Sequence, residues 1–224
     1  MILCIDNVLN PEELQYIRSS LAQAEFVDGK LTAGWHAKLV KDNQQLSTKD
    51  TVAKSVKETV TKGLYRSQLF RMAVKPKNIR SPLISRYEAG MSYGRHVDNA
   101  LMGQGNDLMR SDVSFTVFLN SPEEYEGGEL VMETTQGEQS FKLEAGAMIT
   151  YPSTTLHRVE AVTKGMRLVA VSWVQSLIRD PNEREILFEL ETTRQALFSK
   201  YGKTQEFDLV AKSCANLLRK WSEF

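Results

Sequence analysis

The apolar residues of this chain change their spacing at about Leu83, and this change limits the folds that the chain can adopt. From there to Gln175 they form short segments in which apolar and polar residues tend to alternate, as in half-buried β-strands. The segments span residues 83–88, 93–98, 113–119, 128–132, 139–143, 146–151, 155–162 and 167–175. Turn-forming sequences such as Glu126-Gly127-Gly128 separate them. Eight short strands with this spacing predict a sandwich or jelly roll.

Helical patterns precede the strands. Asn10, Pro11 and Glu13 form an N-cap, a proline at the first helical position and a capping-box glutamate. A second helix is expected after residues 47–50, because apolar residues then recur at steps of four. These are Val52, Val56, Val60 and Leu64. We expect both helices to brace the sheet.

The end of the chain returns to helix. Asp180-Pro181 repeats the cap-proline pattern, Gly202 suits a helix C-terminus, and a further helix is expected from about Thr204. The two helices predict an αα-hairpin whose apolar faces need a cover. The β core and a second copy of the chain, in a homodimer, are both candidates for that cover.

Three regions are therefore expected: an N-terminal support region (1–79), a β core (80–176) and a C-terminal helical extension (177–224). The fold class is mainly β with flanking helices. At 224 residues and 42% hydrophobic content, the chain can bury one substantial core.

Charge and cysteine content favour a cytoplasmic protein that binds neither nucleic acid nor membranes. The 28 basic and 28 acidic residues give no net charge, so no basic surface is indicated. The N-terminus lacks a signal-peptide pattern, and no apolar stretch has the length of a membrane span. Cys4 and Cys214 match no disulfide or zinc pattern, and we expect two reduced core thiols.

Three residues have the composition of a metal site. His96 and Asp98 lie two apart, so on a strand their side chains share one face, and His157 lies on a second predicted strand. Two histidines and a carboxylate form the facial triad that holds non-haem Fe(II) and leaves coordination positions open. His36, the remaining histidine, is expected to be a surface or structural residue.

Arg167 begins the last predicted strand, where its parity places it on one face with Val169, Val171 and Trp173. A buried arginine beside a metal needs an anion, because an unpaired interior charge is costly. A carboxylate matches the guanidinium fork. The pattern therefore predicts a metal site with a carboxylate-binding point.

These residues resemble a known family. The chain is similar to the Fe(II)/2-oxoglutarate-dependent dioxygenases of the prolyl/lysyl hydroxylase type, and most of all to the bacterial PKHD-type hydroxylases. The resemblance is strongest over 80–176. It is carried by Arg86 to Ala100, Phe118-Leu119-Asn120, Glu126 to Leu130, His157-Arg158-Val159 and Arg167.

The resemblance implies a double-stranded β-helix (jelly-roll) core and a set of roles. His96, Asp98 and His157 would bind the iron, Arg167 would bind the C5 carboxylate of 2-oxoglutarate, and Tyr87 would lie near the cosubstrate. Some prolyl hydroxylases have a second tyrosine at that carboxylate, where this chain has Phe118. Another hydroxyl must then assist the arginine, and the candidates are Tyr151 and Thr155.

The implied reaction hydroxylates an unactivated C–H bond, consumes O2 and releases succinate and CO2. The expected substrate is a prolyl or lysyl side chain of a peptide, or a small molecule such as a siderophore, because related enzymes are associated with iron uptake. L-Ascorbate is the expected protector of the metal. A non-catalytic sensor of iron or 2-oxoglutarate and a cupin-like Lewis-acid enzyme are the alternatives. The segment 99–112 is either an active-site lid or an ordinary connection.

Overall fold

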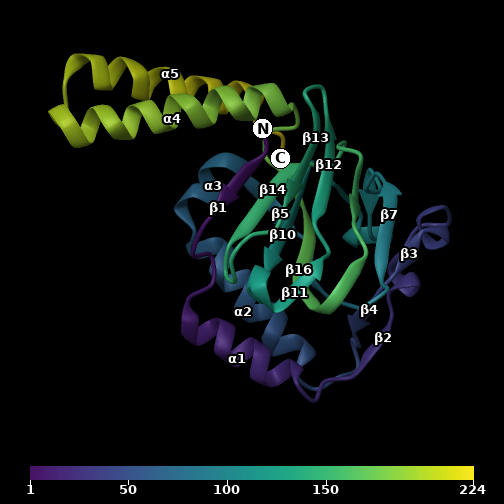
Figure 1. Cartoon of the computed structure of the whole chain (residues 1–224). Coiled ribbons are helices and arrows are strands. Elements are labelled where there is room, and N and C mark those ends of the chain that lie inside the picture. The colour runs from purple at the N-terminus through teal and green to yellow at the C-terminus, as the bar shows by residue number, and fades with distance from the viewer.

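Two antiparallel β-sheets face each other, and helices cover the outer side of the larger one (Figure 1). The computed structural model describes residues 1–224. The larger sheet runs in the order β1 (Leu3–Ile5), β14 (Met148–Pro152), β10 (Val113–Phe118), β16 (Val162–Ser176), β6 (Leu83–Glu88), β4 (Gln44–Leu46) and β2 (Phe26–Asp28). β5 (Pro76–Ile79) and β11 (Tyr125–Gly127) also pair with β16.

The smaller sheet carries the candidate histidines. Its order is β13 (Gly137–Phe141), β12 (Leu130–Thr134), β15 (His157–Val159), β7 (Ser92–His96) and β3 (Lys41–Asp42). A separate two-stranded ribbon, β8 (Leu101–Met102) and β9 (Met109–Arg110), lies within the segment 99–112. Four short 3-10 helices complete the β region: Gly29–Thr32, Ala37–Leu39, Gly105–Asp107 and Pro122–Glu124.

The alternation of side chains along each strand explains how the larger sheet packs against a different layer on each of its faces. In β10, Val113, Phe115 and Val117 belong to a core of 22 buried residues that also includes residues of the first helices. Phe118 belongs instead to a second core of ten residues that spans both sheets. Successive side chains on a strand point to opposite faces, so the larger sheet packs against helices on one side and against the smaller sheet on the other.

Three helices cover the outer face of the larger sheet: α1 (Pro11–Leu21), α2 (Ala53–Arg66) and α3 (Gln68–Val74). The predicted capping box of α1 is present, with Glu13 N donating to the Asn10 side chain and Asn10 N to the Glu13 carboxylate. Val56, Val60 and Leu64 of α2 are fully buried. Full burial of one such side chain contributes roughly 1.5–3 kcal/mol, so these helices stabilise the sheet as expected.

The last two helices, α4 (Pro181–Tyr201) and α5 (Gln205–Trp221), form a hairpin that stands out from the β core (Figure 1). Asp180 caps α4 by accepting from the amides of residues 182 and 183, and Gly202 ends it with a positive φ of 69°. Only Arg184 and Leu187 of α4 and Cys214 of α5 are buried. The hairpin therefore touches the core near its root, and most of its surface lies away from the β core.

The mainly β class, the jelly-roll core and the flanking helices are as predicted. Other details differ. β7 ends at His96, so Asp98 lies beyond the strand. β16 begins at Val162, five residues before Arg167. Cys4 is exposed, so only Cys214 is a core thiol. Helix α3 and strands β1 to β5, β8, β9 and β11 lie outside the predicted segments.

None of the five α-helices combines the length and apolar character that crossing a membrane requires.

Candidate metal centre

Two of the predicted ligands are direct neighbours across two strands. His157 of β15 pairs with His96 of β7, and their ring centroids are 4.3 Å apart. The Nδ1 atom of His96 lies 2.8 Å from the carbonyl oxygen of Gly94, and that of His157 lies 2.9 Å from the carbonyl oxygen of Thr155. A carbonyl accepts only from a protonated Nδ1, so each ring presents its unprotonated Nε2 as a metal ligand.

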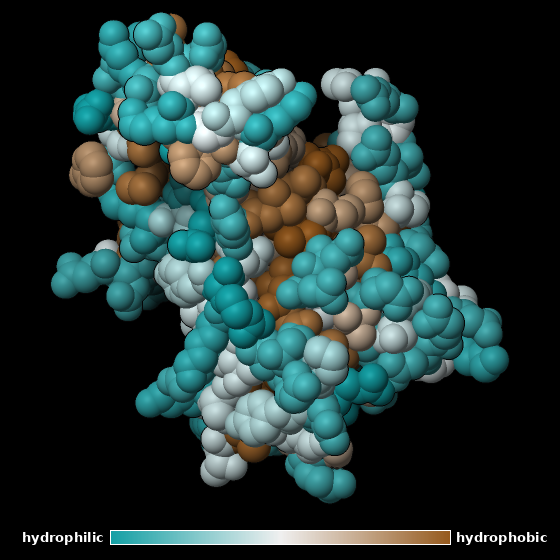
Figure 2. All heavy atoms as spheres, turned by 90° about the vertical axis from the view of Figure 1, so that its left-hand side faces the viewer, coloured by the Kyte–Doolittle hydropathy of each residue, from teal (hydrophilic) through white to brown (hydrophobic).

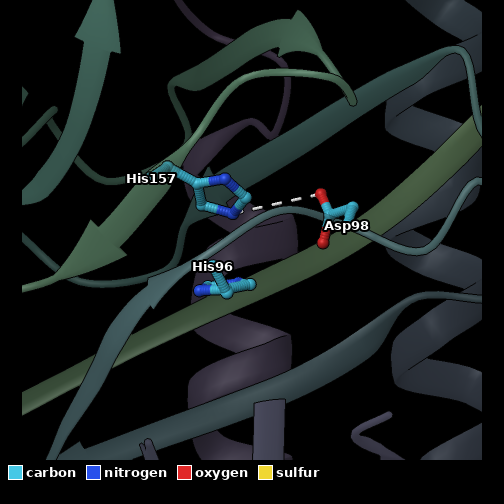
Figure 3. Close-up of side chains that lie close together, drawn as sticks. All are labelled: His96, Asp98 and His157. Atoms are coloured by element: carbon cyan, nitrogen blue, oxygen red, sulfur yellow. Dashed lines mark ion pairs between the residues drawn. The ribbon is translucent and has the colours of Figure 1, made fainter. Parts of the chain in front are cut away.

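The carboxylate reaches the histidines from just beyond the strand. Asp98 Oδ2 lies 3.9 Å from His157 Nε2, and one ligand atom from each of Asp98, His96 and His157 lies within 4.8 Å of the others (Figure 3). Asp98 Oδ2 accepts a hydrogen bond of 2.6 Å from Ser114 Oγ on β10. This bond orients the carboxylate from the larger sheet, while the histidines come from the smaller one.

The cluster fits a divalent cation with open coordination positions. Ligand atoms about 2.1 Å from one ion and at right angles to one another lie about 3 Å apart. The observed separations are larger by about 1 to 2 Å, which small side-chain rotations can close. Two imidazoles and one carboxylate form one face of an octahedron, and the opposite face stays free for reactants.

His96 is held ready to bind metal. Its ring stacks on that of Tyr93, with centroids 3.6 Å apart and an angle of 15° between the planes. Burial, together with the electrostatic effect of the neighbouring His157, lowers the pKa of His96 to about 4. The imidazole is therefore neutral near pH 7, which is the form that ligates metals.

Arg167 is the most unusual buried residue of the chain. It is 1% exposed and is the largest fully buried side chain, yet its guanidinium forms no ion pair with another residue. Its Nε is fully enclosed without an acceptor. An unpaired buried charge costs several kcal/mol, so the arrangement calls for an anionic ligand.

Aromatic rings surround this guanidinium. The Arg167 Cζ atom lies 5.1 Å from the ring centroid of Tyr87 and 5.6 Å from that of Phe118. The hydroxyl of Tyr125 is also buried without a partner. A Cβ on Gly128 would lie 3.1 Å from both Arg167 Cδ and the Tyr125 ring, so only glycine allows this close approach.

One cavity of about 400 Å³ joins these groups. It is lined by all three residues of the cluster, by Arg167 and Tyr87, and by Tyr151, one of the two hydroxyl candidates. Thr155, the other candidate, does not line it. Tyr125 does not line it either, but its ring lies beside the arginine and its buried hydroxyl lacks any other bond. Burial raises the pKa of Tyr125, and the Arg167 charge opposes part of that rise.

Several other lining residues could not be identified from the sequence. Lys41, Asn43 and Gln45 come from the N-terminal region that we expected only to support the sheet. Asn43 is 3% exposed, and neither polar atom of its side chain has a hydrogen-bond partner. These residues follow no motif, and only the pairing of β3 with β7 and of β4 with β6 brings them to the cavity.

Comparisons with known proteins agree with this geometry. The family described as the 2OG-Fe(II) oxygenase superfamily matches residues 82–175. A PKHD-type hydroxylase from Synechococcus sp. (strain JA-2-3B'a(2-13)) is 60% identical over 223 residues, with 100% of each chain covered. Among solved structures, a Pseudomonas putida prolyl-4-hydroxylase is similar, with a TM-score of 0.53, 16% identity and coverage of 78% of this chain and 92% of that one.

A prolyl hydroxylase from Trichoplax adhaerens, solved with a peptide fragment of the hypoxia inducible factor oxygen degradation domain, has a TM-score of 0.56 and 16% identity. The similarity covers 83% of this chain and 86% of that one. At these identities the two structures support the fold, and the Synechococcus relative supports the family.

Proposed function

Because the chain belongs to the 2OG-Fe(II) oxygenase superfamily and to its PKHD-type hydroxylases, we propose that His96, Asp98 and His157 hold its Fe(II). The enzyme is an Fe(II)/2-oxoglutarate-dependent dioxygenase of the hydroxylase type. With 2-oxoglutarate and O2, the bound iron supplies the oxidation of an unactivated C–H bond, with release of succinate and CO2. The observation that carries the residue assignment is a buried, unpaired arginine in the same cavity as a His-Asp-His cluster.

The cavity residues have distinct tasks in this proposal. The backbone carbonyls of Gly94 and Thr155 orient the two imidazole ligands, and the Ser114 hydroxyl orients the carboxylate ligand. Arg167 binds the C5 carboxylate of 2-oxoglutarate through its guanidinium fork. Tyr125 positions that guanidinium or shares the carboxylate, in place of the hydroxyl that Phe118 lacks. Tyr87 packs against the arginine and closes the same end of the cavity.

Iron and cosubstrate binding can be measured directly. In anaerobic titration the wild-type protein should form the visible absorption band of the Fe(II)–2-oxoglutarate chelate. Asp98→Ala should weaken Fe(II) binding by at least about 100-fold, since loss of even an outer-shell partner costs roughly 10- to 100-fold. Asp42→Ala, an exposed aspartate on β3, is the matched control. Wild-type iron affinity in Asp98→Ala would remove that residue from the metal site.

We propose two candidate substrate classes: a prolyl or lysyl side chain of a peptide, and a small molecule such as a siderophore. Iron uptake is the proposed physiological setting. L-Ascorbate is the proposed agent that restores oxidised metal. A non-catalytic sensor would form the chelate band but produce no succinate with any substrate. A Lewis-acid enzyme of the cupin type would act without 2-oxoglutarate. Screening peptides and metabolites for stimulated succinate release therefore separates the three.

We also propose that the helical hairpin joins two copies of the chain. It exposes large apolar side chains at Ile186, Phe198, Tyr201, Leu209 and Leu218. Figure 2 shows further apolar atoms on the surface below the hairpin. Phe198→Asp should then convert a dimer to a monomer by light scattering, whereas Tyr16→Asp, on exposed α1, should not. A monomeric wild-type protein would reject the interface.

A cytoplasmic location completes the proposal, because two unpaired thiols suit a reducing compartment.

A further inference from the structure

The outer part of the cavity holds an arginine with no partner. Arg80 lines the cavity and is half-buried, and its guanidinium forms no hydrogen bond or ion pair with another side chain. Its backbone is fixed, because Arg80 N donates to Trp173 O at 3.0 Å and Ser172 Oγ donates to Arg80 O at 2.7 Å. The guanidinium lies against the 99–112 segment, where a Cβ on Gly103 would be 3.0 Å from its Nη1.

Strand register places the Arg80 backbone nearer to Ser114, which holds Asp98, than to Arg167. Trp173 of β16 pairs with Ser114, whose hydroxyl holds Asp98, and Arg80 bonds to Trp173 from the opposite side. Two strand spacings, about 10 Å, therefore separate the backbones of Arg80 and Ser114. Arg167 lies six residues along the same strand from Trp173, roughly 20 Å away. An anion held by Arg80 is thus distinct from the carboxylate at Arg167.

The charge of the cavity favours an anionic substrate. Its lining includes three cationic residues, Lys41, Arg80 and Arg167, and one acidic residue, Asp98. A doubly charged iron and the dianionic cosubstrate cancel each other, so two positive charges remain. A surface with one predominant sign attracts ligands of the other, and the arginine fork matches a carboxylate.

The substrate must also extend beyond the cavity. About 400 Å³ is near the lower end of the roughly 300–1,000 Å³ typical of ligand pockets, and the cosubstrate takes the inner part. The room left suits one side chain. Two segments, 29–40 and 97–108, contribute lining residues and also extend beyond the cavity. We call them the mouth segments, and they come together where a Cβ on Gly34 would be 3.3 Å from Asn99 Oδ1.

The mouth segments are unusually apolar for an exposed surface. Their large exposed hydrophobic residues are Leu31, Trp35, Leu39, Val40, Val97, Leu101 and Leu108. Trp35 is 84% exposed and Leu39 is 82% exposed, which is costly unless a partner covers them. Only Val97 and Leu101 of these line the cavity, so a molecule that fits inside it would leave the other five uncovered.

Resting on the proposed function, we propose that the primary substrate is a polypeptide segment that inserts one side chain toward the metal, places an acidic residue on Arg80 and lays apolar neighbours on the mouth segments. A polypeptide supplies all three groups in one chain at fixed spacing. The carboxylate is the specificity element, because Arg80 lines the cavity and its guanidinium has no side-chain partner.

The test uses the full-length enzyme with Fe(II), 2-oxoglutarate and O2, and libraries of ten-residue peptides with a central proline or a central lysine. Peptides that gain one oxygen are identified by mass spectrometry. The wild type should select Asp or Glu at one fixed distance from the central residue. Arg80→Gln should lose that selection and lower kcat/KM for the best peptide by about 5- to 30-fold. This loss is smaller than the loss expected on removing one partner of a fully buried charged pair, because Arg80 is half-exposed.

Charge reversal gives the sharper comparison. Arg80→Glu should select Lys or Arg at the same peptide position, whereas Arg71→Gln, an exposed arginine on α3, should behave as the wild type. Trp35→Ala should raise the peptide KM, and Tyr65→Ala, an exposed aromatic on α2, should not. The KM for 2-oxoglutarate should stay constant in every variant.

Four results would overturn the proposal. Unchanged acidic selection in Arg80→Gln, or a raised KM for 2-oxoglutarate, would remove the substrate carboxylate from Arg80. Arg80-dependent turnover of small free acids with no modified peptide would replace the polypeptide by a metabolite. Absence of any modified peptide while the chelate band forms would also reject the polypeptide. Failure to form the band would instead reject the proposed function.

Discussion

Replacing Arg167 with methionine should leave the ligand-free protein folded and no less stable. The guanidinium is 1% exposed without an ion pair, and an uncompensated buried charge costs several kcal/mol. Its contacts with the rings of Tyr87 and Phe118 return roughly 0.5–2 kcal/mol each, and methionine restores part of that through sulfur–aromatic contacts. The free energy of unfolding should therefore stay constant or rise by up to about 2 kcal/mol.

The same substitution should remove most of the affinity for 2-oxoglutarate. A hydrogen bond to a charged group contributes about 1.5–3 kcal/mol, so Arg167→Met should weaken binding about 10- to 150-fold. At a concentration of 100 times the wild-type Kd, the cosubstrate stabilises the wild type by about 2.7 kcal/mol. A variant with 100-fold weaker binding would gain only about 0.4 kcal/mol at that concentration.

Thermal unfolding under nitrogen, with Fe(II) and with or without 2-oxoglutarate, measures both effects. For a chain of this size, each kcal/mol shifts Tm by about 2–4 °C. Arg71→Met, on the exposed side of α3, controls for the loss of an arginine. A ligand-free Arg167→Met protein that is less stable by several kcal/mol would mean that the arginine is structural. Full stabilisation by 2-oxoglutarate would mean that the cosubstrate binds elsewhere.

Other predictions follow from single contacts. Ser114→Ala removes the hydrogen bond to Asp98 and should weaken Fe(II) binding about 10- to 100-fold in metal titration, and unchanged affinity would show that the bond does not orient the ligand. Cys4 should react with a thiol reagent in the native protein and Cys214 only after denaturation, and equal rates would contradict their burial. A bidentate arginine of α2 lowers the pKa of Glu13, so Glu13→Gln should cost up to about 1 kcal/mol at pH 7. That difference should vanish as the pH falls through the lowered pKa, since this contribution exists only while the carboxylate is ionised, and a constant difference would exclude the ion pair.

The parts of the fold that follow from local rules could be predicted. Period-two alternation identified β6, β10 and β16, and cap chemistry at Asn10 and Asp180 marked where helices begin. In each case, the residues that carry the signal are neighbours in sequence. The parity of Arg167 within its strand was equally local, and it placed the residue on the inner face.

Long-range pairing determines what the sequence did not reveal. Asn43 reaches the cavity because β3 and β4 pair with strands that lie about 40 to 50 residues later. Tyr125 lies beside Arg167 because β11 turns back along β16. Asp98 was expected beside His96 because both would lie on one face of a strand. It does lie beside His96, but β7 ends before Asp98, and the hydrogen bond from Ser114 orients its carboxylate.

The distribution of unsatisfied polar atoms supports a ligand at the Arg167 end of the cavity. Four buried side-chain atoms lack a hydrogen-bond partner, and they belong to Asn43, Tyr125 and Arg167. Asn43 and Arg167 line the cavity, and Tyr125 lies against Arg167. Each unpaired buried group costs about 1–3 kcal/mol, and random defects would be scattered through the core. Their gathering at one end means that a ligand with several acceptor oxygens, such as a dicarboxylate, recovers this energy when it binds.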